Sequence, residues 1–253
     1  MIVQTTEAIV LQTQDYKESD RLITFYTRGA GKLKGLAKGA RRSRKRFANT
    51  FELFSLVNLT YRAPKSLVWI EACKLLEPHL ALRSDLQRWA HAALACEVVL
   101  EMTPEGDTEE ELFLLLKSAL PRFAAGKDPE NLVLLFLLRF LSITGYLPEL
   151  GECSVCKKRV RSATRWNWNM GRGTLFCPEH HAQGGGVSLD LGTLMLIRQL
   201  RQLPLEKIWR LHLLQDNKSR VFNALVEWMR GQIGRDLNSL KLLEQIRPIQ
   251  NGV

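Results

Sequence analysis

The sequence lacks the long apolar segments that would mark a membrane or secreted protein. Its most apolar run, Leu132 to Leu138, is bounded by Glu130 and Arg139. That run is far shorter than the roughly 20 apolar residues that a membrane-spanning helix needs, so we expect a buried helix there. The N-terminal segment has no cationic stretch ahead of a solid apolar block, so no secretion signal is expected.

Catalytic motifs are also missing. The sequence contains no nucleophile elbow, no HExxH pair and no paired-carboxylate motif. A phosphate-binding nucleotide loop is excluded where it comes closest, because Gly31 and Lys32 are followed by Leu33 in place of Ser or Thr. Cys73 and Cys96 lie in apolar stretches and are expected to be buried small side chains, not nucleophiles. The sequence therefore predicts a protein that is not an enzyme.

Acidic residues are absent from one long stretch of the chain. None occurs between Asp20 and Glu52, and residues 28–46, which we call the basic segment, read RGAGKLKGLAKGARRSRKR with nine Lys or Arg. Residues 1–80 hold 14 basic and 7 acidic residues, so they supply much of the formal net charge of +10. Solvated faces normally mix both signs, which favours a nucleic acid as partner over a solvated loop. The residues expected to contact phosphates are Lys32, Lys34, Lys38, Arg41, Arg42, Arg44, Lys45 and Arg46.

Five short segments between residues 5 and 77 are rich in Val, Ile, Thr and aromatic residues, which is typical of strands. This number of strands suggests a small barrel, and the OB-fold is such a barrel that commonly binds single strands. Aromatic residues here could stack on bases, although strand alternation sends roughly half of them into the core. The candidates are Phe25, Tyr26, Phe47, Phe51 and Tyr61.

Helical periodicity begins at Ser84. One expected helix is opened by a capping box of Thr108 and Glu111, and the next has Asp128 as its N-cap. The predicted fold class is α+β multidomain, with an N-terminal OB-fold barrel followed by an α-helical domain that carries an inserted zinc-binding module. The predicted boundaries are 1–80 for the barrel, 81–147 and 184–253 for the two parts of the helical domain, and 148–183 for the module.

Three of the five cysteines cluster with a histidine. Two residues separate Cys153 from Cys156 and Cys177 from His180, with 20 residues between the pairs. Two such turns supply the four corners of a tetrahedral zinc site, and four protein ligands predict one structural ion. His181 is the alternative fourth ligand. This cysteine usage favours a reducing cytoplasm over a disulfide scaffold.

Two tryptophans, Trp166 and Trp168, lie within the predicted module beside Arg165. Stacking on nucleic-acid bases is one interpretation of this pattern. Packing over the small metal module is the other, and it is the favoured one because such a module has little core of its own.

At this point the sequence resembles a known family, the bacterial recombination mediator RecO, over nearly its whole length. The matching segments are TEAIVLQTQDYKESDRLITFYTRGAGKLKGLAKGARRSRKRF near the start, GYLPEL before CSVC, and the later CPEH. The sequence departs from the family's common four-cysteine arrangement by ending in His180. Histidine ligates zinc well, so this departure concerns the geometry of the site more than the metal.

The resemblance implies a DNA repair and homologous recombination mediator of the RecFOR pathway, which binds single- and double-stranded DNA and anneals complementary strands. It also implies partnership with RecR and with the single-stranded DNA-binding protein SSB, and an indirect role in loading RecA. A cytoplasmic, nucleoid-associated protein that is a monomer when free is expected. A zinc-containing RNA-binding or transcription factor is the alternative, and an enzyme using zinc is a third possibility.

The SSB tail in this family is acidic and ends in hydrophobic residues, so its receptor should be an apolar groove rimmed by cations. Arg139, in the expected buried helix, is a candidate anchor for this tail. A core arginine paired with a local carboxylate is an equal alternative. Weaker candidates are Arg198, Arg201 and Arg210.

Overall fold

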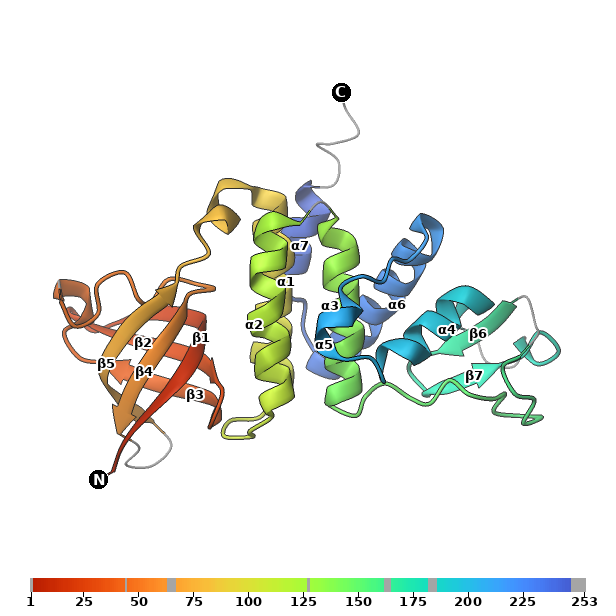
Figure 1. Ribbon diagram of the computed structural model, residues 1–253, viewed down its shortest axis with the longest axis horizontal. Coiled ribbons are helices and arrows are strands. Elements are labelled where there is room, and N and C mark those ends of the chain that lie inside the picture. The colour runs from red at the N-terminus through yellow and green to blue at the C-terminus, as the bar shows by residue number, and fades with distance from the viewer. Residues whose placement is uncertain are drawn as a thin grey trace. The chain divides into compact units, whose positions relative to one another are not determined.

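The computed structural model describes residues 2–43, 45–62, 67–126, 128–161, 165–181 and 186–246. The chain forms two compact units: unit 1 comprises Met1–Lys127 and Leu237–Val253, and unit 2 comprises Asp128–Asp236 (Figure 1). The predicted division into four segments places its boundaries at other residues and stays a prediction. Among the described residues, no helix combines the length and the apolar character needed to cross a membrane.

Unit 1 begins with a closed five-stranded barrel in the order β1-β2-β3-β5-β4. Neighbouring strands are antiparallel except β3 and β5, which pair in parallel. The barrel is OB-like, so the strand count predicted this part of the fold correctly. The strands are β1 (Val3–Tyr16), β2 (Asp20–Thr27), β3 (Gly31–Ala37), β4 (Leu56–Arg62) and β5 (Val68–Glu77).

The barrel closes because alternate side chains of all five strands point into one apolar core. Each large apolar side chain buried there contributes roughly 1.5–3 kcal/mol to folding. Closure also depends on Gly35, where β3 meets β5. A Cβ at this position would lie 2.8 Å from Cγ1 of Ile70, so only glycine fits without a shift of the Ile70 side chain.

Three helices complete unit 1: α1 (Leu86–Met102), α2 (Glu110–Ala125) and α7 (Asn238–Ile246). The predicted capping box at the start of α2 is wrong. Glu109 is the N-cap, and its carboxylate accepts a hydrogen bond from the amide of Glu111 at 3.2 Å, so the helix begins one residue later than the box requires. A short 3-10 turn, Leu80–Ser84, links the barrel to α1.

Unit 2 contains a helical part and a small sheet. Helix α3 (Pro129–Ile143) begins as predicted, with the Asp128 carboxylate accepting from the amide of Asn131 at 3.0 Å, and contains the apolar run of the sequence as buried side chains. The sheet has the order β7-β6-β8. The remaining elements are β6 (Arg165–Asn169), β7 (Thr174–Phe176), β8 (Val187–Asp190), α4 (Leu191–Leu200), α5 (Leu205–Ile208) and α6 (Gln215–Ile233).

Candidate nucleic-acid interface and metal centre

The part of the basic segment that follows β3 is attached to the barrel on both sides. Gly39, in the left-handed conformation at φ 68°, donates its amide to the Asp20 carboxylate at 2.8 Å. Further along, Phe47 and Phe51 are buried in the barrel core with ring centroids 5.1 Å apart. Arg41, Arg42, Lys45 and Arg46 lie between these two anchors, which tie the chain to the barrel on either side of them.

Five of the eight predicted phosphate-binding residues are exposed on this segment: Lys38, Arg41, Arg42, Lys45 and Arg46. A sixth, Arg44, lies outside the described residues. Lys34 is half-buried on the outward face of β3. Arg46 donates to the carbonyl of Lys38 at 2.6 Å, which fixes the direction of its side chain. Their exposure leaves these five side chains accessible to a phosphate from solvent.

In the folded protein, an acidic residue from outside the acid-free stretch lies next to the basic segment. Asp15, at the end of β1, lies 3.6 Å from the Nε of Arg41 and 3.1 Å from the Nε of Arg21. The three side chains are between 33% and 54% exposed, so this cluster contributes little to stability. Sequence reasoning missed Arg21, which adds a cation beside the basic segment even though it precedes it in the chain.

Lys32 is placed differently from the other cations. Its ammonium donates to the carbonyl of Leu100 at 2.6 Å, near the C-terminus of α1. A cation at this end of a helix satisfies a free carbonyl and interacts favourably with the helix dipole. Burial lowers the pKa of Lys32 from its usual value, and the carboxylates of Glu101 and Glu105 oppose that shift. The predicted phosphate contact is therefore corrected: Lys32 joins the barrel to α1.

The five aromatic residues predicted as stacking candidates are all buried, so this prediction is wrong. On β2, Phe25 faces the barrel core, while Tyr26 faces the other side of the strand and is covered there, its hydroxyl donating to the carbonyl of Glu109 at 3.5 Å. The barrel strands do expose two other aromatic residues, Trp69 on β5 at 46% and Tyr16 at the end of β1 at 40%. The sequence indicates the exposure of Trp69, because it lies between the apolar residues Val68 and Ile70, which face the core.

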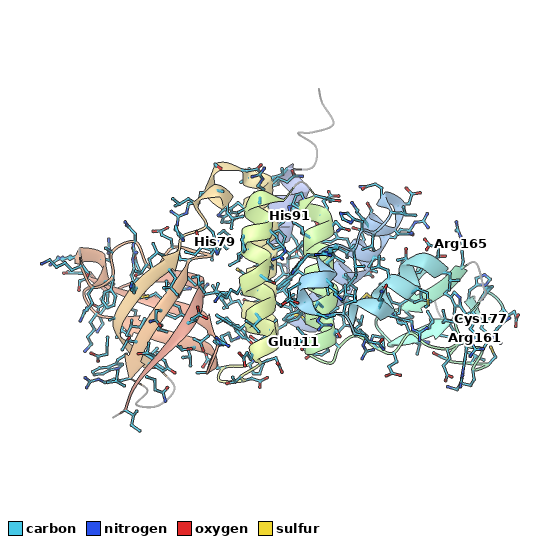
Figure 2. All side chains as sticks on the ribbon, viewed as in Figure 1. His79, His91, Glu111, Arg161, Arg165 and Cys177 are labelled. Carbon is cyan, nitrogen blue, oxygen red and sulfur yellow. The ribbon has the colours of Figure 1, made fainter. Side chains whose placement is uncertain are left out.

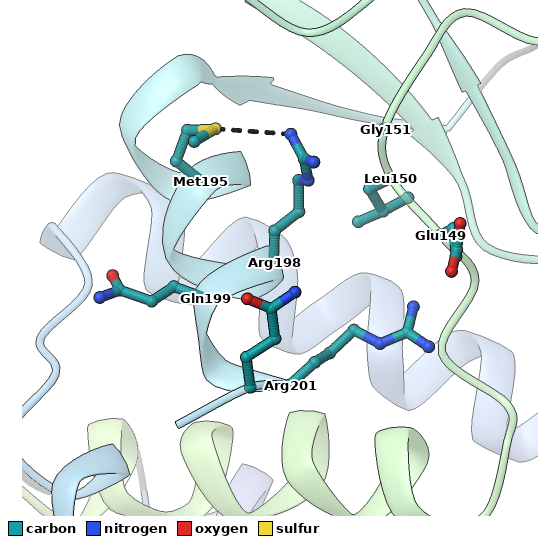
Figure 3. A pocket seen from close by; sticks show the side chains of 8 residues that line it. Glu149, Leu150, Gly151, Met195, Arg198, Gln199 and Arg201 are labelled. Carbon is teal, nitrogen blue, oxygen red and sulfur yellow. Dashed lines mark hydrogen bonds between the residues drawn. The ribbon is translucent and has the colours of Figure 1, made fainter. Parts of the chain in front are cut away.

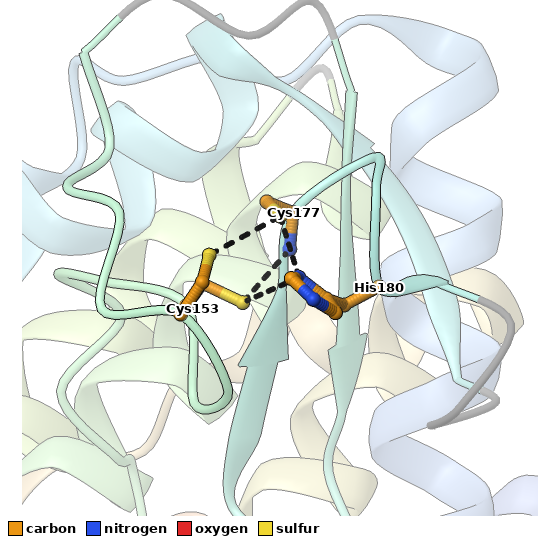
Figure 4. Close-up of side chains that lie close together, drawn as sticks. Cys153, Cys177 and His180 are labelled. Atoms are coloured by element: carbon orange, nitrogen blue, oxygen red, sulfur yellow. Dashed lines mark hydrogen bonds between the residues drawn. The ribbon is translucent and has the colours of Figure 1, made fainter.

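The metal-site residues predicted from their spacing lie together in unit 2. Cys153, Cys156, Cys177 and His180 place one ligand atom each within 4.8 Å of all the others, and Figure 4 shows Cys153, Cys177 and His180 converging. Two tight turns hold them. The amide of Lys157 donates to the carbonyl of Cys153 at 3.0 Å, and the amide of His180 donates to the carbonyl of Cys177 at 3.0 Å.

The distances between ligand atoms fit one tetrahedral metal ion. Metal–sulfur bonds of about 2.3 Å at the tetrahedral angle put two sulfurs roughly 3.8 Å apart. The two sulfurs of Cys156 and Cys177 are 3.8 Å apart, and the Nδ1 of His180 lies 3.8 Å from the sulfur of Cys153 and 3.3 Å from that of Cys177. This Cys3His cluster could hold a metal ion. The ring of His181 is directed elsewhere, with its Nδ1 2.5 Å from the carbonyl oxygen of Pro178.

Backbone amides around the cluster favour a thiolate. Burial raises the pKa of the Cys153 thiol, but hydrogen bonds from the amides of Cys177, Cys156 and Val155 outweigh it and lower the pKa to about 6. For Cys177 the balance is reversed, and burial raises its pKa. A bound cation would displace that remaining proton, because metals bind the deprotonated form of cysteine.

Trp166 and Trp168 pack inside the small sheet beside this cluster, at 1% and 0% exposure. Both are on β6, two residues apart, so they point to the same face of the strand. Packing, the favoured of their two interpretations, is confirmed, and base stacking by either residue is excluded by burial. Figure 2 shows Arg161, Arg165 and Cys177 in this part of unit 2.

Arg139 is not at the surface, which corrects its prediction as an anchor for a peptide. The side chain is buried at 8% exposure, and its guanidinium donates to the carbonyls of Leu200 and Arg201 at 2.7 and 2.6 Å. These carbonyls end helix α4, so the arginine caps the C-terminus of a neighbouring helix. Arg139 is therefore a core arginine, as the alternative interpretation held, and backbone carbonyls are among its acceptors.

A cavity of about 700 Å³ lies on unit 2 at the end of α4. Its wall combines the apolar side chains of Leu150 and Met195 with the cations Arg198 and Arg201, as Figure 3 shows. Glu149 also lines it. Arg198 and Arg201, which the sequence ranked as weaker candidates, therefore line a cavity that also has apolar residues in its wall.

The other cysteines are packing residues, as the sequence predicts, and two isolated histidines are also buried, whereas His212 is exposed. Cys73 and Cys96 are buried, and burial raises the pKa of the Cys73 thiol to about 12. His79 and His91 are buried in unit 1 (Figure 2). None of these buried side chains offers a thiolate or an imidazole to solvent.

Comparisons with known proteins cover nearly the whole chain. A family model described as Recombination protein O N terminal matches residues 1–79, and one described as Recombination protein O C terminal matches residues 83–241. A protein of Syntrophobacter fumaroxidans named DNA repair protein RecO is 55% identical over 241 residues, 95% of this chain and 96% of the relative. Proteins of the same name from Syntrophus aciditrophicus and Symbiobacterium thermophilum are 34% and 30% identical, and the matches cover at least 95% of each chain.

Proposed function

This chain belongs to the RecO family of DNA repair proteins, and from that premise we propose that it binds single- and double-stranded DNA and anneals complementary strands. With RecR, it helps RecA to load onto DNA that is coated by SSB. This work takes place in the cytoplasm, at the nucleoid, and involves no covalent step.

The observation that supports the proposal is the basic segment, which carries five exposed cations beside an OB-like barrel, four of them between its two anchors on the barrel. Annealing requires two polyanions to approach each other, and their repulsion is the main barrier. A dense row of cations lowers that barrier for the second strand once the first is bound. Nucleotide hydrolysis is not needed for such a step.

The metal in the Cys3His cluster is proposed to be a single structural Zn²⁺ ion. Three soft thiolates and one imidazole in tetrahedral arrangement are the donor set that zinc prefers. With all four positions taken by Cys153, Cys156, Cys177 and His180, no position remains for a reacting water. The ion would hold the two turns together and with them the small sheet of unit 2.

Annealing and its salt dependence test the proposed function. We expect complementary oligonucleotides, both naked and SSB-coated, to anneal in the presence of the protein without a nucleotide cofactor. If five side chains each neutralise one phosphate of a single strand, the log-log slope of affinity against salt should be about −3.5. A slope near zero would contradict the electrostatic mode. Binding that prefers RNA and is not accompanied by annealing would instead support an RNA-binding factor.

The cavity beside α4 is proposed to receive the acidic tail of SSB. Leu150 and Met195 supply an apolar surface, and Arg198 and Arg201 supply the opposite charge, which together suit a peptide that is acidic and ends in hydrophobic residues. Replacing Arg198 with Glu is expected to weaken binding of a labelled tail peptide on the order of tenfold, because the tail then meets a like charge.

Arg210→Glu is the matched control for this replacement, because it makes the same charge change at an exposed arginine that does not line the cavity. Fluorescence anisotropy of the peptide measures both affinities. Equal losses in the two variants would indicate a general effect of net charge and would remove the cavity as the receptor.

A further inference from the structure

Trp69, on the described barrel of unit 1, is an exposed tryptophan, with 46% of its surface accessible to solvent. Its strand neighbours Val68 and Ile70 face the core, so alternation directs the indole to the outer face. In the sheet it pairs with Leu36 of β3 on one side and with Arg62 of β4 on the other. The indole therefore lies where β3 ends and the basic segment continues.

The basic segment itself contacts this indole. The ammonium of Lys38 lies over the ring of Trp69, 4.3 Å from its centroid. Lys38 is exposed, and its carbonyl accepts the hydrogen bond from Arg46. This part of the surface therefore combines an aromatic face with positive charge. The aromatic face is that of Trp69, and the two cations are Lys38 and Arg46.

We propose that Trp69 is a base-stacking residue for single-stranded nucleic acid, with Lys38 as its phosphate-binding neighbour. The inference rests on the proposed DNA binding and names a residue that acts by stacking within it. Stacking on an aromatic face requires an unpaired base but no particular base, because every base has a π-face. Trp69 would thus act on single strands and not on duplexes, whereas the arginines of the basic segment act on both.

The contact with Lys38 is consistent with such a role. An exposed cation–π contact is weaker than the stacking of a base on an aromatic ring, so an arriving base can displace the ammonium. The displaced lysine, on its flexible stem, then meets the phosphate of the same nucleotide. In the free protein Lys38 covers part of an indole that would otherwise be an isolated apolar surface.

The test compares Trp69→Ala with Tyr146→Ala, a matched control in unit 2 at 47% exposure. Affinity for an oligothymidine and for a duplex of equal length is measured over a range of salt concentrations. We expect Trp69→Ala to weaken single-strand binding about tenfold while duplex binding and the salt slope stay unchanged. Trp69→Phe, which keeps a smaller ring, should lose less. Quenching of intrinsic fluorescence by oligothymidine should fall in both Trp69 variants.

Three outcomes would overturn the inference. In the first, the wild type binds oligothymidine, and Trp69→Ala binds it as tightly as the Tyr146→Ala control does. Another is an equal loss for single strands and duplexes, since that would indicate an effect other than stacking. If the wild-type protein binds no oligothymidine at all, both the stacking role and the proposed function fail, which distinguishes this result from the other two.

Discussion

Replacing Cys153 with Ser is expected to release the metal from unit 2 and to unfold the small sheet around it. A serine hydroxyl does not ionise at neutral pH, so the site would lose the thiolate that the surrounding amides favour most. Structural zinc contributes roughly 10–16 kcal/mol in small modules, which is comparable to the whole stability of a domain. Mass spectrometry under native conditions measures the metal content, and amide hydrogen exchange locates the unfolding.

The control for this prediction is the neighbouring histidine pair. His180→Ala should also lose metal, whereas His181→Ala should retain it, because the His181 ring nitrogen lies against the carbonyl of Pro178 and not at the cluster. In every variant the barrel of unit 1 should keep its protection against exchange. Full metal content in Cys153→Ser would show that this cluster is not the binding site.

Neutralising five cations of the basic segment is expected to abolish annealing and to weaken DNA binding at least about 100-fold near physiological salt, because each lost phosphate contact also loses its counterion release. The metal should stay in place, since these residues belong to unit 1 and the cluster to unit 2. Annealing of complementary oligonucleotides is the measurement. The residues replaced together are Arg41, Arg42, Arg44, Lys45 and Arg46.

A second variant separates the site from the overall charge. It replaces five exposed cations of unit 2, so that the change in net charge is the same. Its annealing rate should stay close to that of the wild type. If both variants lose annealing equally, net charge and not the basic segment is responsible. The control positions are Arg172, Lys207, Arg210, Arg220 and Arg235.

Local patterns predicted the metal cluster and the barrel well. The two-residue spacings of the cluster form turns whose geometry depends on few residues, so the sequence places Cys153 and Cys156 side by side without knowledge of the rest of the fold. The five strands were recognisable because each one carries its own β-forming residues. Their closure into a barrel also uses a local feature, the missing side chain of Gly35.

The sequence by itself thus determined the OB-like barrel, the Cys3His cluster and the excess of positive charge. Only the tertiary structure decided which side chains of each element face solvent. Lys32 is bonded to the end of α1, Arg139 caps α4, and Tyr26 is covered beyond the barrel core, while Trp69 remains exposed. The reason is that strand and helix periods specify the face on which a residue lies, whereas its exposure depends on what distant segments of the chain pack against that face.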